Sequence, residues 1–154
     1  MYNWIRKLID YRLANCKSCR STKVLRCIQP TMSPSELCKE IMQMDPKIRF
    51  VGICDETGEI KYGGMREGLK PLLSPDETKN SMKEAFARWG TRNILATKLG
   101  KARYAMAEYE KTKRITVPLD DPHHLLLVST AVEADHTRII DNILKLKINS
   151  ARLS

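Results

Sequence analysis

The sequence contains no long apolar run. In its C-terminal half the longest uninterrupted apolar stretch is Leu125–Val128, whereas a helix that spans a bilayer needs about 20 such residues. Near the start, Arg6, Lys7 and Asp10 interrupt the apolar stretch that a secretory signal requires. The sequence therefore predicts neither a transmembrane helix nor a signal peptide, and we expect a cytoplasmic protein.

Signatures of enzymes are also missing. The loop Gly63–Lys70 holds glycines and two cations, but it matches neither the P-loop pattern nor the dinucleotide-binding glycine pattern. We therefore interpret it as an irregular loop rather than a phosphate site. Paired carboxylates and Ser-His-Asp sets have no persuasive spacing. We expect that the chain is not an enzyme and needs no cofactor.

The cysteines do not form a disulfide framework or a complete metal site. All five fall within the first 54 residues, and their odd number and irregular spacing argue against disulfides. Cys16 and Cys19 are weak zinc candidates because thiolates at this spacing can chelate one ion, but a structural zinc site needs four ligands. Since Cys27 and Cys38 lack the matching close spacing, we expect no bound metal.

A second group of candidate reactive residues has a simpler explanation. Cys54 becomes a nucleophile only if His123 or His124 approaches it, and its place at the end of an apolar strand predicts burial. Adjacent histidines on a strand point to opposite faces, so at most one of the two could join a given site. We interpret Asp120–His124 as a polar turn.

Positive charge is concentrated at the N-terminus. Residues 1–31 carry seven Lys and Arg side chains against the single acid Asp10, so this segment supplies +6 of the net charge of +9. Residues 1–14 predict a short basic amphipathic helix, and residues 15–31 lose periodicity and read as a tether. We expect residues 1–31 to be a basic extension, flexible or outside the native protein if Met32 is the true initiator.

The extension offers a candidate surface for an anionic partner. Aromatic residues beside cations suit either nucleic acid or an anionic membrane surface. The candidate residues are Trp4, Arg6, Lys7, Arg12, Lys17 and Arg20. Charged tails of this length are more often only solvated.

The remaining chain, residues 32–150, predicts one α+β domain. At 154 residues and 42% hydrophobic content, a core can form without disulfides or metal. Ser-Pro-x-Glu capping boxes at Ser33 and Ser74 predict two helix starts. The predicted elements are a helix from Ser33 to Asp45, a hairpin over Ile48–Gly64, a long helix from Ser74 to Gly100, a hairpin over Ala102–Leu119, a strand His124–Thr130 and a helix Asp135–Lys147. Their order, α-β-β-α-β-β-β-α, predicts a single five-stranded antiparallel sheet with helices.

This order resembles the roadblock/dynein light chain domain, a profilin-like sandwich. The Phe50–Tyr62 hairpin with its acidic-Gly turn, the long helix from Pro75 and the Leu125–Thr130 strand before a last helix carry the resemblance over residues 33–148. The chain is also similar to small archaeal proteins related to that domain. The resemblance implies a homodimer paired through the long helix and a sheet edge, and a regulator or platform for small GTPases.

Two functional hypotheses follow. The first is a non-catalytic dimerisation and scaffold protein, with large apolar side chains at the interface. The interface candidates are Met82, Phe86, Trp89, Tyr104, Met106 and Tyr109, although some of them must fill the monomer core. The alternative is a PAS-like or GAF-like sensor that holds a small ligand inside the sandwich.

Overall fold

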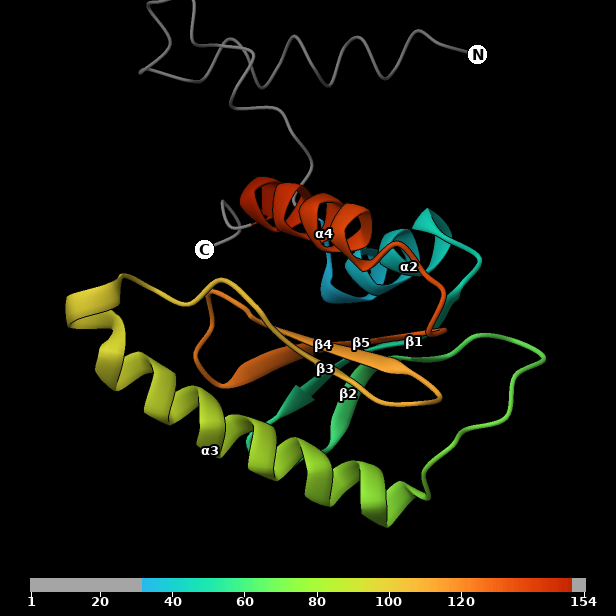
Figure 1. Ribbon diagram of the computed structural model, residues 1–154, viewed down its shortest axis with the longest axis horizontal. Helices are drawn as coiled ribbons and strands as arrows, with labels where there is room; N and C mark the ends of the chain where they lie inside the picture. The colour runs from blue at the N-terminus through green and yellow to red at the C-terminus, as the bar shows by residue number, and fades with distance from the viewer. Residues whose placement is uncertain (1–31, 151–154) are drawn as a thin grey trace, which may run out of the picture. The chain divides into compact units, whose positions relative to one another are not determined.

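The computed structural model describes residues 32–150, and its elements have the predicted order (Figure 1). The helices are α2 (Pro34–Met44), α3 (Pro75–Leu99) and α4 (His136–Ser150); the strands are β1 (Ile48–Asp55), β2 (Ile60–Met65), β3 (Ala105–Glu108), β4 (Lys113–Pro118) and β5 (His124–Thr130). None of these helices is long and apolar enough to cross a membrane. The predicted α+β class is confirmed.

Both predicted capping boxes are present. At the start of α2 the Glu36 backbone N–H donates to the Ser33 hydroxyl, and the Ser33 N–H donates to the Glu36 carboxylate. Ser74 and Glu77 repeat these two bonds at the start of α3. Each box satisfies N–H groups that the first helical turn leaves unpaired, so both helices begin where the sequence predicts.

The five strands form one antiparallel sheet in the order β2-β1-β5-β4-β3. The chain builds the β1–β2 hairpin first, crosses through α3 to the far edge, and returns so that β5 pairs with β1. Strands β2 and β3 are therefore the two edges. Among the described residues, neither edge has a second strand beside it.

The sheet separates two apolar cores (Figure 1). Helices α2 and α4 lie on one face and form the larger core with alternate side chains of β1, β4 and β5. Helix α3 lies on the other face and buries only Met82, Ala85 and Trp89, which pack against Cys54, Leu125 and Leu127. A helix of 25 residues that buries three leaves much of its own surface, and of the sheet beneath it, uncovered.

Arg66 joins the end of α2 to the sheet. Its guanidinium donates to the backbone carbonyl oxygens of Ile48 (2.6 Å), Asp45 (2.8 Å) and Met42. The Asp45 carboxylate, which lies at the end of α2, accepts the Lys47 N–H at 2.8 Å and pairs with Arg138 of α4 at 2.7 Å. Arg66 therefore has a structural role. The expected irregular loop over Gly63–Lys70 is wrong at its start, because Gly63, Gly64 and Met65 belong to β2 and pair with β1.

Candidate functional site

Cys54 and the two histidines do not form a reactive set. The Cys54 thiol is buried and donates to the Leu125 carbonyl oxygen at 3.3 Å. Burial, reinforced by the nearby Asp55 charge, raises its pKa to about 12. His123 instead contacts Glu56 at 2.7 Å, and His124 contacts Asp121 at 2.6 Å. The expected burial of Cys54 is confirmed, and both histidines contact carboxylates rather than the thiol.

The predicted metal ligands and anion-binding residues lie outside the described residues. Cys16, Cys19 and the six candidates for an anionic partner (Trp4, Arg6, Lys7, Arg12, Lys17 and Arg20) all belong to residues 1–31. Within residues 32–150 no group of three or more His, Cys, Asp or Glu side chains is arranged to hold a metal ion.

The six residues predicted for pairing do not share one surface. Met82 and Trp89 are buried against the sheet, where the Trp89 indole N–H donates to the Thr116 hydroxyl at 3.0 Å. Phe86 is partly buried beside them. Met106 packs against the core on the α2 and α4 face. Met82 and Trp89 are thus two of the candidates that fill the monomer core, and the interface role of the other four stays a prediction.

Tyr104 and Tyr109 remain at the surface. They flank β3, one of the two edge strands of the sheet, and are 46% and 54% exposed. A shallow groove beside β3 is lined by Ala107 and Tyr109 from the strand side, and by Arg88 and Arg92 from α3. The edge of β3 and the side of α3 that carries Arg88 and Arg92 thus border the same groove and form one continuous surface.

One side of α3 carries a stripe of side chains that the monomer does not bury. Arg88, Arg92, Leu95 and Leu99 recur at i, i+4, i+7 and i+11, so they lie on one side of the helix. We call these four residues the α3 stripe. Leu95 is 49% exposed and Leu99 is 79% exposed, and Arg92 lies over the Trp89 ring at 5.3 Å. Neither leucine belongs to the two apolar cores of the described residues.

Comparison with known proteins assigns the family and the fold. A family model described as "Family of unknown function (DUF6659)" matches residues 32–149. The chain belongs to the DUF6659 family. Among the curated proteins no match to this chain was found.

Solved structures show that this DUF6659 chain has a roadblock-like, profilin-like fold. The Roadblock/LC7 domain from Streptomyces avermitilis is 16% identical, with a TM-score of 0.56, over 77% of this chain and 93% of that one. The gliding protein MglB from Thermus thermophilus is 13% identical (TM-score 0.50; 74% and 87% covered). Profilin from Schizosaccharomyces pombe is 17% identical (TM-score 0.52; 79% and 99% covered). The resemblance expected from the element order is confirmed for the fold.

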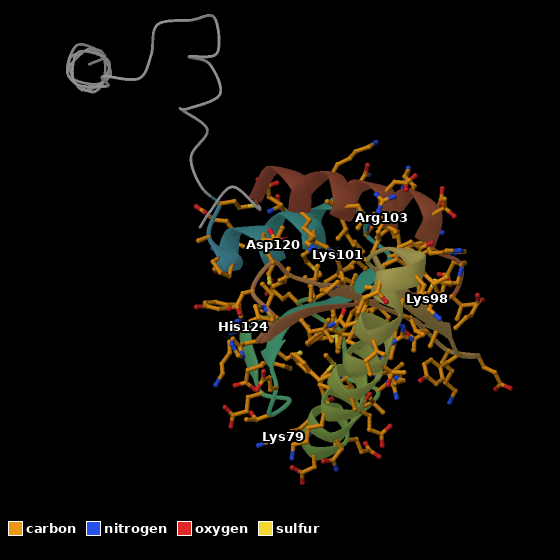
Figure 2. The ribbon with its side chains drawn as sticks, turned by 90° about the vertical axis from the view of Figure 1, so that its left-hand side faces the viewer. Lys79, Lys98, Lys101, Arg103, Asp120 and His124 are labelled. Atoms are coloured by element: carbon orange, nitrogen blue, oxygen red, sulfur yellow. The ribbon has the colours of Figure 1, made fainter. Side chains whose placement is uncertain are left out.

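Two cavities flank α3 in this DUF6659 fold. One, of about 600 Å³, lies between the start of α3, the loop before it and the sheet. The other, of about 730 Å³, lies near the C-terminal end of α3 and includes Lys101 and Arg103. Figure 2 shows Lys98, Lys101 and Arg103 near this end, with Lys79 at the opposite end. The first cavity lies where α3 leaves the sheet uncovered, and the second also includes Leu144 and Lys147 of α4.

Proposed function

We propose that this chain is a non-catalytic scaffold protein that forms a homodimer through the α3 stripe and the free edge of β3. The observation that carries this proposal is the continuity of two exposed features. An unpaired strand edge offers backbone N–H and C=O groups to a second strand, and the adjacent stripe offers Leu95 and Leu99 as apolar contacts.

A two-fold axis beside β3 suits both features. In such a dimer the same patch on each protomer meets its copy, so β3 can pair with the partner's β3 while the two α3 stripes pack together. The stripe also carries Arg88 and Arg92, and acidic side chains lie nearby: Glu84 contacts Arg88 at 3.4 Å, and Glu108 ends β3. These acids offset the positive charge that pairing two stripes brings together.

The opposite sheet edge is the less suitable one for pairing. Strand β2 carries Lys61, which forms ion pairs with Asp55 (2.9 Å) and Glu59 (2.8 Å) at the end of the hairpin. A lysine on an edge strand opposes strand addition, because pairing would have to desolvate its charge. We therefore assign pairing to β3.

We further propose that the dimer acts as a regulator or platform for another protein, with a small GTPase as the partner class that the roadblock resemblance implies. Two α3 helices side by side give a broad surface without a catalytic group. The proposal that the chain is not an enzyme agrees with the inert environment of Cys54, whose thiol is buried and bonded to a carbonyl oxygen.

Light scattering on the full chain tests the dimer. The expected mass is twice the chain mass of 17.7 kDa at micromolar concentration, and it should fall toward one chain mass on dilution. A mass of one chain at all concentrations would remove the scaffold proposal.

A binding titration tests the partner class. Purified small GTPases in their GDP and GTP forms should be titrated with the chain. Binding that depends on the nucleotide supports a GTPase platform, and its absence rejects that partner class.

A further inference from the structure

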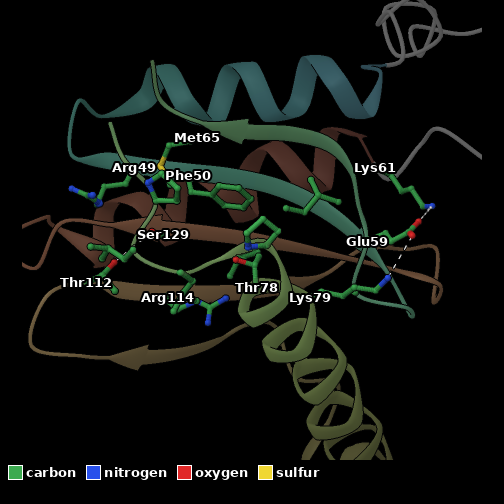
Figure 3. A pocket seen from close by; sticks show the side chains of 17 residues that line it. Arg49, Phe50, Glu59, Lys61, Met65, Thr78, Lys79, Thr112, Arg114 and Ser129 are labelled. Atoms are coloured by element: carbon green, nitrogen blue, oxygen red, sulfur yellow. Dashed lines mark hydrogen bonds and ion pairs between the residues drawn. The ribbon is translucent and has the colours of Figure 1, made fainter. Parts of the chain in front are cut away.

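The cavity at the start of α3 has the features of a ligand site (Figure 3). Its volume of about 600 Å³ falls within the range of about 300–1,000 Å³ that is typical of small-molecule sites. It arises because α3 contacts the sheet through Met82, Ala85 and Trp89, which leaves the sheet next to its first turns uncovered.

The floor of the cavity is one row of the sheet. Phe50 of β1, Ser129 of β5 and Arg114 of β4 are register partners, so their side chains lie side by side on the α3 face. The next row contains Gly52 and Leu127. A Cβ at Gly52 would lie 2.7 Å from the Phe50 ring, so the absence of a side chain there lets this ring lie flat over the strand and keeps the space above it open.

The walls of the cavity are apolar. Phe50 and Leu127 contribute from the sheet, and Leu72 and Leu73 contribute from the loop before α3. Leu72 is 54% exposed and Leu73 is 37% exposed. Large aliphatic side chains left in water around a cavity lose solvent contact when an apolar group fills it, which favours binding of such a group.

Charge is distributed unevenly along the cavity. Figure 3 shows Arg49 and Thr112 toward one end, Arg114 near Thr78, and Glu59, Lys61 and Lys79 toward the other end. At the second end Glu59 accepts from Lys61 at 2.8 Å and pairs with Lys79 at 3.6 Å, so these charges compensate one another.

The two arginines that line the cavity have no carboxylate partner among the described side chains. Within residues 32–147 neither Arg49 nor Arg114 has a carboxylate within ion-pair distance: Arg49 donates to the Lys70 carbonyl oxygen at 3.4 Å, and Arg114 donates to the Ser81 hydroxyl. Burial lowers the pKa of Arg114. A partly buried guanidinium without an anion is costly, and a ligand carboxylate would pair with its planar fork.

We propose that this cavity binds one small amphipathic carboxylate, such as a medium-chain fatty acid. Its carboxylate pairs with Arg114, and its apolar tail lies along Phe50, Leu72 and Leu127. The reverse orientation would place the carboxylate beside Lys61 and Lys79, whose charges Glu59 and Asp55 already compensate. The inference does not depend on dimerisation, since the floor and walls come from one chain.

Calorimetric titration of the full chain with decanoate, below its micelle-forming concentration, tests the proposal. We expect saturable binding at one decanoate per chain, and weaker binding of decan-1-ol, which has the same tail without the charge. Arg114→Gln should weaken decanoate binding roughly tenfold to hundredfold, the loss expected for a charged hydrogen bond, with little effect on decan-1-ol. Arg103→Gln is the matched control, because Arg103 is exposed and does not line this cavity.

A second variant keeps the test decisive if Arg114→Gln does not fold. Leu72→Glu adds a carboxylate at a half-exposed loop position, where the fold tolerates it, and should also weaken decanoate binding. Absence of saturable binding, equal affinity for decanoate and decan-1-ol, or an equal loss in Arg103→Gln would overturn the proposal. The titration measures decanoate binding, whereas light scattering measures the mass of the assembly. A negative titration would therefore reject the ligand proposal without affecting the dimer proposal.

Discussion

At the residue scale, Gly63 is the described position where the fold most strongly requires glycine. Its φ of 87° lies in the left-handed region, and a Cβ there would be 2.1 Å from the Val51 carbonyl oxygen of the paired strand. The neighbouring Gly64 has no atom within 4 Å of such a Cβ. The same substitution at two adjacent positions should therefore have very different effects.

We expect Gly63→Ala to lower the free energy of unfolding by at least about 2 kcal/mol, because the backbone must leave an unfavourable conformation and the β1–β2 pairing must shift. Gly64→Ala should change it by less than about 0.5 kcal/mol. Urea unfolding followed by circular dichroism measures both. Equal losses in the two variants would mean that the hairpin does not have this geometry.

The buried thiols give a second prediction at this scale. Burial raises the pKa of Cys38 to about 11 and that of Cys54 to about 12, so thiolate, the form that reacts, is scarce at pH 8. We expect neither residue to be alkylated by iodoacetamide in the folded chain, and both to react after unfolding in urea. Peptide mapping by mass spectrometry reads the two sites separately. Rapid labelling of Cys54 in the folded chain would reopen its role as a nucleophile.

Asp45 links residue chemistry to the pH dependence of stability. Hydrogen bonding from the Lys47 N–H, followed by the Arg138 guanidinium, holds the pKa of Asp45 below its ordinary value of 3.8. A lowered pKa stabilises the folded state above the ordinary value, and this stabilisation is lost as the pH falls through the lowered pKa. Wild-type stability should therefore rise with pH across the acid range below about pH 5.

Comparison of Asp45→Asn with wild type isolates this contribution from that of the other carboxyls. The variant should show a shallower rise, whereas Asp141→Asn, which removes an exposed carboxylate from α4, should keep the wild-type slope. Thermal unfolding at a series of pH values measures this slope of stability against pH. Parallel curves for Asp45→Asn and wild type would contradict the assignment.

At the element scale, the start of α3 positions one wall of the cavity. The Ser74 hydroxyl accepts the Glu77 N–H at 3.2 Å, and the Glu77 carboxylate accepts the Ser74 N–H at 2.7 Å. Ser74→Ala should cost about 1 kcal/mol of stability, the usual effect of losing an N-cap side chain. Asn80→Ala, at an exposed position inside the helix, should cost nothing, because alanine favours helix. Urea unfolding measures the free energy of unfolding of both variants. An equal loss in the two would mean that the Ser74 side chain does not stabilise the start of α3.

Elements were the most predictable level of this structure. Capping boxes, turn glycines and apolar periodicity are local signals, and they predicted the order and starts of the elements from Ser33 to α4. Which side chains an element buries was less predictable. Met82 and Trp89 were placed at an interface because large apolar groups serve a core and an interface equally well, and only the three-dimensional packing distinguishes the two.

The candidate sites depended even more on packing. The sequence predicted no shared site for Arg114 and Phe50, because their proximity arises from the pairing of β1 and β4 with β5 between them. Strand partners far apart in the chain leave no local pattern. Leu95 and Leu99 did continue a visible apolar pattern, but their exposure could not be deduced from it, because α3 extends beyond the sheet contacts that would cover them.

At the scale of the whole molecule, the basic extension should not be needed for pairing. The residues proposed for the interface all lie between Arg88 and Tyr109. A chain of residues 32–154 should therefore also form a dimer, with a light-scattering mass of twice its own, smaller chain mass. A monomer for residues 32–154 beside a dimer for the full chain would place the pairing surface in residues 1–31 instead.

The most direct test of the dimer compares two glutamates placed on opposite sides of α3. Leu99 belongs to the α3 stripe and is 79% exposed, while Ile94 is 76% exposed on another side of the same helix. Both substitutions cost the monomer little, because neither side chain is buried. Light scattering at micromolar concentration should report a monomer for Leu99→Glu and an unchanged dimer for Ile94→Glu; a dimer that survives Leu99→Glu, or one that only Ile94→Glu breaks, would contradict pairing through the α3 stripe.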